Sequence, residues 1–177
     1  MIDRVLSSIA GELNEFLGSY YDLPEGMAEL GEIGGGRGEV VANKMVVSLL
    51  NIEREGAMGI NSRFKNAEGD RMVQGAPAWH LNIWFVVAAV FEEKRYAESL
   101  KMLSTAIVFL QRNNLLRTDG RQRFMIEPVT LDMQELTNLW SMLGGHYYPS
   151  VVCKIRMLTF DSGEIKKTVS RIKGVKL

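Results

Sequence analysis

The chain has 177 residues, a length that favours a single domain whose core needs no metal or disulfide to hold it. Apolar residues make up 46% and charged residues 24%, as in soluble globular domains, and 21 basic residues balance 21 acidic ones. This zero net charge disfavours a function in binding nucleic acid or anionic membranes. It also means that copies of the chain do not repel one another at long range. The single cysteine, Cys153, excludes an internal disulfide and is typical of a chain folded in a reducing cytoplasm.

The first half of the chain predicts one helix and two strands. Apolar residues recur every three or four positions from Ile2 to Tyr20, which predicts a long amphipathic helix that ends before Pro24. The glycine-rich stretch GEIGGGRG at 31–38 predicts a surface loop. Buried strands are predicted at 45–53 and from residue 79 to 91, with a long exposed loop or hairpin arm at 54–76 between them.

The second half predicts two helices and two strands. An amphipathic helix is expected at 95–112, with its apolar side formed by Tyr96, Leu100, Leu103, Ile107 and Leu110 together with the neighbouring Val108 and Phe109. A strand at 121–129 contains Pro128, which favours an edge position. Thr130 or Asp132 caps a helix that ends at Gly144–Gly145, with Trp140 on its buried side, and a half-buried strand follows at 151–159.

This order of elements predicts an α+β fold, a mixed four- to five-stranded sheet with packed helices. We expect one domain at residues 1–163 and a C-terminal tail at 164–177. No apolar run approaches the about 20 residues that span a bilayer, and no export segment is apparent, so we expect synthesis in the cytoplasm.

Patterns typical of catalysis or of bound cofactors do not occur. The glycine-rich stretch is followed by Glu39 instead of the lysine and hydroxyl of a phosphate-binding loop. His80 and His146 belong to no metal-binding motif, and Cys153 alternates with basic residues on a strand whose own face is apolar, as a buried small hydrophobe would. We therefore expect no enzyme, metal or cofactor; a small hydrolase with His80 or His146 as base is the least favoured alternative.

Candidate interface residues fall into three groups. Arginines surround a turn at Asp119–Gly120, two tyrosines follow the glycine pair, and basic residues alternate with apolar ones in the tail. These candidates are Arg117, Arg121, Arg123, Tyr147, Tyr148, Lys166, Lys167, Arg171 and Lys173.

Three stretches carry a resemblance to a known family. They read PAWHLNIWFVVAAVF at 77–91, LTNLWSMLGG at 136–145 and YPSVVCKIRM at 148–157. They resemble the tail terminator or cap proteins encoded beside phage-tail-like contractile injection systems, and the resemblance extends over residues 1–165.

The resemblance implies a structural protein that forms a homohexameric ring on the end of the inner tube and the last sheath layer. Such a ring stops polymerisation and anchors the sheath. Its partners are other copies of itself and the tube and sheath subunits, with no nucleic acid and no small-molecule substrate. The particle is assembled in the cytoplasm and is then released or stays anchored to a cell. An alternative is an adaptor or chaperone that helps a tail component to assemble without joining a ring.

Overall fold

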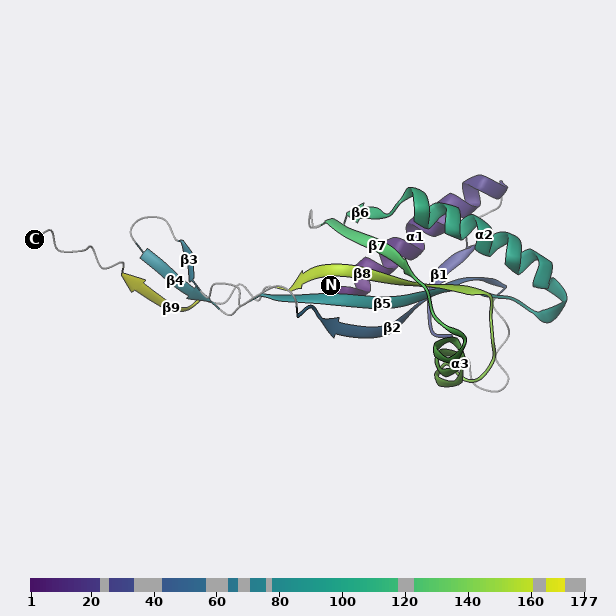
Figure 1. Ribbon diagram of the computed structural model, residues 1–177. Coiled ribbons are helices and arrows are strands. Elements are labelled where there is room, and N and C mark those ends of the chain that lie inside the picture. The colour runs from purple at the N-terminus through teal and green to yellow at the C-terminus, as the bar shows by residue number, and fades with distance from the viewer. Residues whose placement is uncertain are drawn as a thin grey trace, which may run out of the picture. The chain divides into compact units, whose positions relative to one another are not determined.

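A computed structural model of the protein, drawn in Figure 1, describes most of the chain. The described residues are 1–22, 26–33, 43–56, 64–66, 71–75, 78–117, 123–160 and 165–170. The chain forms two compact units: Met1–Ile52 with Ile83–Arg156, and Glu53–Asn82 with Met157–Leu177. The division into a domain at 1–163 and a tail at 164–177 remains a prediction.

The larger sheet has six strands in the order β1-β2-β5-β8-β7-β6. They are β1 (Ala28–Leu30), β2 (Lys44–Arg54), β5 (Trp79–Val90), β8 (Ser150–Phe160), β7 (Arg123–Val129) and β6 (Leu115–Arg117). β1 is parallel to β2, whereas β7 is antiparallel to both β6 and β8, so the predicted mixed sheet is confirmed. The sheet exceeds the expected four to five strands because β1 and β6 have three residues each, too few to show an alternating pattern.

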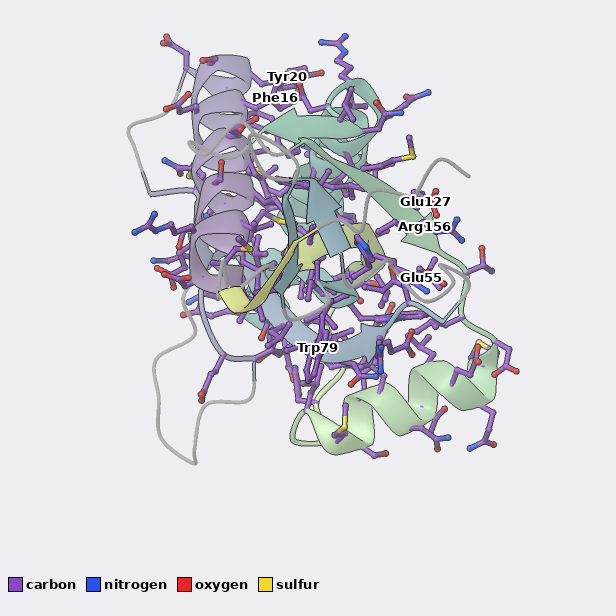
Figure 2. All side chains as sticks on the ribbon, turned by 90° about the vertical axis from the view of Figure 1, so that its left-hand side faces the viewer. Phe16, Tyr20, Glu55, Trp79, Glu127 and Arg156 are labelled. Carbon is purple, nitrogen blue, oxygen red and sulfur yellow. The ribbon has the colours of Figure 1, made fainter. Side chains whose placement is uncertain are left out.

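The position of β7 corrects one expectation. Pro128 predicted an edge strand, yet β7 lies second from the edge, inside β6. β6 pairs only with Arg123–Met125, and Pro128 faces Cys153 on β8 instead. Among the described residues, β7 therefore has no outer neighbour at Pro128, which is where a residue without an N–H is tolerated. On the inner side, Arg156 Nε of β8 lies 2.9 Å from Glu127 Oε2 of β7 (Figure 2).

Three helices cover the two faces of this sheet. α1 (Ile2–Tyr21) and α2 (Tyr96–Arg112) lie on one face, and α3 (Met133–Met142) lies on the other (Figure 1). A short 3₁₀ turn, η1 (Glu93–Arg95), leads into α2. As predicted, α1 ends before Pro24, and Gly144 and Gly145 adopt the positive φ angles that terminate α3. No helix in the described ranges combines the length and apolar character that a bilayer crossing requires.

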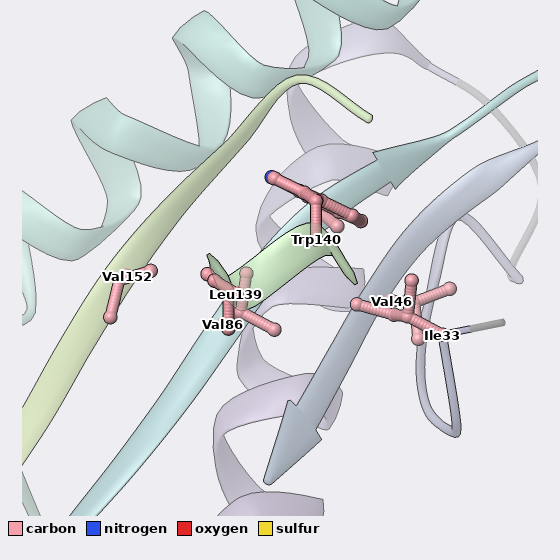
Figure 3. Packing of buried hydrophobic residues seen from close by; sticks show 7 residues of the cluster. Ile33, Val46, Val86, Leu139, Trp140 and Val152 are labelled. Atoms are coloured by element: carbon pink, nitrogen blue, oxygen red, sulfur yellow. The ribbon is translucent and has the colours of Figure 1, made fainter. Parts of the chain in front are cut away.

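The core lies on both sides of β5. Ile83, Phe85 and Val87 alternate with Val86 and Ala88, and all five side chains are fully buried. On the α3 face the buried residues form one cluster (Figure 3): Ile33, Val46, Val86, Ala88, Leu139, Trp140 and Val152. Cover on both faces of the strand from Val86 onwards was predicted and is confirmed.

The buried side of α2 matches the predicted one at Phe109 and Leu110 and differs elsewhere. Tyr96, Leu100 and Ile107 are 53%, 42% and 47% exposed, while α2 buries a neighbouring stripe. That stripe consists of Ser99, Met102, Thr105, Ala106, Phe109 and Leu110. Two contacts with α1 fix this rotation: the rings of Phe16 and Phe109 lie 5.6 Å apart, and Tyr21 Oη lies 2.7 Å from Thr105 Oγ1.

The second unit contains a three-stranded sheet in the order β3-β4-β9. Its strands are β3 (Phe64–Asn66), β4 (Arg71–Gly75) and β9 (Ile165–Ser170), and both pairings are antiparallel. The 54–76 segment therefore contains the predicted hairpin. Part of the predicted tail pairs with it as β9.

Candidate functional site

The sequence starts α3 with a complete capping box. Glu135 N donates a hydrogen bond to Asp132 Oδ1 at 2.7 Å, and Asp132 N donates to Glu135 Oε2 at 2.9 Å. Each carboxylate therefore satisfies an N–H that the first helical turn leaves without a backbone acceptor. Of the two predicted caps, Asp132 is the one used, and it fixes the start of the helix.

The chain turns sharply at the end of α3 and brings two tyrosines back onto Trp140. Gly145 N donates to Trp140 O at 2.7 Å, and the left-handed backbone at Gly144 and Gly145 reverses the chain. The ring centroids of Tyr147 and Tyr148 then lie 5.6 and 5.8 Å from that of Trp140, both edge-on. Trp140 is thus held between the sheet and two aromatic side chains.

This corner of the molecule encloses a groove of about 520 Å³, here called the α3 groove. Its lining residues are Met133, Leu136, Thr137, Trp140, Ser141, Gly145 and Tyr147. None of them carries a charge. Met133 is 77% exposed and Tyr147 54% exposed, whereas Trp140 at 4% forms the buried wall.

The polar groups of the α3 groove are mostly used within the helix. Thr137 Oγ1 donates to Met133 O at 2.7 Å, and Ser141 Oγ donates to Thr137 O at 2.8 Å. The indole Nε1 of Trp140 is buried and has no hydrogen-bond partner in the described part of the chain. An apolar occupant can therefore cover the groove without breaking hydrogen bonds, which suits a protein–protein contact rather than a reaction.

The predicted interface residues are spread over separate places. Tyr147 lines the groove, and Tyr148 is half-buried against Trp140, with its ring 4.5 Å from that of His146. Arg117 and Arg123 occupy directly opposed positions of the β6–β7 pair.

Lys166 and Lys167 lie in β9, while Arg121, Arg171 and Lys173 fall outside the described residues. Their roles remain predictions. Met133 was missed although it precedes Leu136 by three residues and Trp140 by seven, a helical spacing that could have found it.

The residues weighed for catalysis each have neighbours of their own. His80 Nδ1 lies 3.1 Å from Thr159 Oγ1, and the ring of His146 is tilted against that of Tyr148. Cys153 is completely buried, as predicted, and burial raises the pKa of its thiol to about 12. Within the ranges that the structure describes, no three His, Cys, Asp or Glu side chains are placed to hold a metal ion. Residues 34–42, with most of the glycine-rich stretch, lie outside those ranges.

Comparison with known proteins adds a family and a fold. The model of the Pvc16 N-terminal domain family matches residues 5–173. The fold is similar to the PVC sheath/tube terminator of an extracellular contractile injection system in its extended state, with a TM-score of 0.61 and 12% identity. It is also similar to the tube-terminating cap of the anti-feeding prophage, with a TM-score of 0.64 and 12% identity.

These matches cover 94% of this chain in both cases, but only 61% of the PVC terminator and 58% of the prophage cap. The chain thus spans about three fifths of the length of either structure. No curated protein matches the sequence. The likeness confirms the tail-terminator type of fold predicted from the sequence.

Proposed function

The chain belongs to the Pvc16 N-terminal domain family, and from this premise we propose that it caps the tube and sheath of a contractile injection particle. The observation that carries the proposal is the agreement of two independent comparisons. The family model spans residues 5–173, and the same region has the fold of two proteins that terminate such tubes.

In this proposal the protein is a structural part that ends polymerisation and anchors the last sheath layer. It acts as a homohexameric ring, whose partners are other copies of the chain and the tube and sheath subunits. The ring is assembled in the cytoplasm and then becomes part of the particle. A closed ring needs two different contact patches on every subunit, because each copy meets its neighbours with opposite sides.

The residues described above are consistent with a structural, non-enzymatic role. α3 borders an uncharged groove, and burial raises the pKa of the Cys153 thiol. The two structural neighbours are described as a sheath/tube terminator and a tube-terminating cap.

Particles assembled with and without this protein test the proposal directly. We expect particles with the protein to have a uniform length, with the protein labelled at one end of the tube in electron micrographs. Without it, tubes of variable length and detached sheaths are expected. Uniform, stable particles in the absence of the protein would overturn the cap function.

The same preparation separates the cap from an assembly adaptor. Purified finished particles contain a cap in a fixed ratio to tube subunits, whereas an adaptor is left behind. Native mass spectrometry of the isolated protein adds a check on the ring, which would have a mass of about 120 kDa, six times the 19.9 kDa chain.

A further inference from the structure

The outer side of α2 carries a row of four apolar side chains, three of them exposed and one, Leu103, half-buried. Spacings of four, three and four residues place this row on one side of the helix. The row is here called the α2 ridge and consists of Tyr96, Leu100, Leu103 and Ile107. Exposed apolar stripes of this spacing are typical of helices that pack against a partner.

Uncharged residues flank the solvent side of the α2 ridge. Ala97, Ser104 and Gln111 flank its solvent side, and all three are exposed. Ser104 Oγ donates to Leu100 O at 2.8 Å, so its hydroxyl is already used within the helix. At the start of the helix, Arg95 Nε donates to Glu98 Oε2 at 2.6 Å, so these two charges offset each other. A partner can therefore cover Leu100, Leu103 and Ile107 without burying an unpaired charge.

The α3 groove has the complementary character. It is concave and uncharged. The hydroxyls of Thr137 and Ser141 in its lining donate to carbonyls of their own helix, as Ser104 does on α2. α2 and α3 belong to the same compact unit and lie on opposite faces of its sheet (Figure 1). One rigid unit thus presents an apolar ridge on one side and an apolar groove on the other.

We infer that the α2 ridge of one copy packs into the α3 groove of the next copy. This inference rests on the proposed ring and names its subunit contact. Since ridge and groove lie on opposite faces, a copy whose groove is filled still presents its own ridge, and the contact repeats head to tail until the ring closes. The zero net charge of the chain, with 21 basic and 21 acidic residues, places no overall repulsion against this association.

Pairing of two ridges is the competing arrangement. It would bring two convex surfaces together and stop at two copies, leaving both grooves empty. Insertion of the ridge into the groove uses both apolar surfaces, and we therefore choose it.

Two double variants test the contact. Leu100→Glu with Ile107→Glu places carboxylates on the ridge, and Thr137→Glu with Ser141→Glu places them in the groove. Because all new charges have the same sign, the variants cannot rescue each other through a new ion pair. Lys101→Glu on α2 and Asn138→Glu on α3 are matched controls, since both positions are exposed but lie off the ridge and outside the groove lining. Circular dichroism verifies the fold of each variant.

The oligomeric state is measured by sedimentation velocity at increasing concentration. We expect the unaltered chain and both controls to assemble. In each double variant the dissociation constant for self-association should rise by at least about 100-fold, because a carboxylate is costly to bury unpaired. An equimolar mixture of the two double variants should form a dimer of about 40 kDa, twice the 19.9 kDa chain, and nothing larger. In that dimer the intact groove of one variant holds the intact ridge of the other.

Four results would overturn the inference: a monomeric unaltered chain, full assembly of either double variant, a mixture that stays monomeric, or dimers of the groove variant alone. The last result would indicate ridge-to-ridge pairing. The cap function is tested separately, by the length of the particles. A ridge variant that still ends tubes normally would contradict this subunit contact but not the cap function.

Discussion

Trp140 and Tyr147 meet edge to face, with ring centroids 5.6 Å apart and an angle of 71° between their planes. The contact joins the last turn of α3 to the segment that follows the glycine pair, so it closes one end of the α3 groove. Tyr147 is more than half exposed, and its ring makes the contact.

Replacement of Tyr147 should therefore affect stability through its ring and not through its hydroxyl. We expect Tyr147→Ala to lower the free energy of unfolding by about 0.5–1.5 kcal/mol, the usual value of such an aromatic pair. Tyr147→Phe keeps the ring and should leave stability unchanged. Urea unfolding followed by circular dichroism measures both, and an equal loss in the two variants would show that the hydroxyl carries the contact instead.

Trp140 offers a sharper test, because its buried indole N–H makes no hydrogen bond within the described residues. Trp140→Ala should cost about 3–5 kcal/mol, as expected for removal of a large buried ring. Trp140→Phe keeps most of the packing and removes an unsatisfied donor, whose burial is itself costly, so we expect a loss of no more than about 1 kcal/mol. The comparison again uses urea unfolding, and a phenylalanine variant as unstable as the alanine variant would mean that the N–H has a partner.

The capping box sets the stability of α3 and hence the shape of its groove. Asp132→Ala leaves the first turn without the acceptor for Glu135 N, and we expect it to cost about 1 kcal/mol, within the usual range of 0.5–2. Gln134→Ala is the matched control: it removes only an exposed side-chain hydrogen bond to Asn138 and should cost a few tenths of a kcal/mol, about 0.2–0.5. Equal losses from the two variants would contradict a stabilising role for the cap.

The sequence alone predicts those helices and strands whose apolar pattern is long and fits only one arrangement. The stripe from Ile2 to Tyr20 predicts α1 closely, and the glycine pair marks the end of α3. β1 and β6 could not be predicted in this way, because three residues show no period and their pairing depends on neighbours distant in the chain.

α2 shows a different limit of sequence reasoning. Its sequence contains two overlapping apolar stripes, one through Leu100 and Ile107 and another through Met102 and Phe109. Periodicity alone cannot decide which is buried. The contact of Phe109 with Phe16 decides it, and this contact joins residues 93 positions apart. Tyr147 was found as an interface candidate from its residue type, whereas Met133 was not.

A single side-chain oxygen holds the chain as it approaches β1. Asn14 Oδ1 accepts hydrogen bonds from the backbone N–H groups of Gly26, Met27 and Ala28 at 3.1, 2.7 and 3.1 Å. Asn14→Ala removes an acceptor shared by three donors, and we expect a loss of about 1–3 kcal/mol. Asn14→Asp retains the acceptor and should lose much less. Hydrogen exchange at Met27 and Ala28 provides the local readout: faster exchange is expected in the alanine variant only, and unchanged exchange there would contradict this role of Asn14.

Cys153 makes stability depend on pH in the alkaline range. Burial raises the pKa of its thiol to about 12, from 9.0 when it is unperturbed. Below pH 9 the thiol is protonated in both states and its contribution is fully present. Between these values the unfolded chain loses the proton while the folded protein keeps it, so stability falls as pH rises, by at most about 1.4 kcal/mol per pH unit.

The comparison with Cys153→Ala isolates this effect from the titration of lysines and tyrosines. At mild pH the unaltered protein should be the more stable, because the alanine leaves a small cavity beside β7. Its advantage should shrink by about 1 kcal/mol between about pH 8.5 and pH 10, since only the unaltered protein has a thiol to ionise on unfolding. Urea unfolding at each pH measures the difference. A difference in stability that stays constant across that range would mean that the thiol ionises equally in the folded and unfolded states. In that case a thiol reagent should also label the folded protein rapidly.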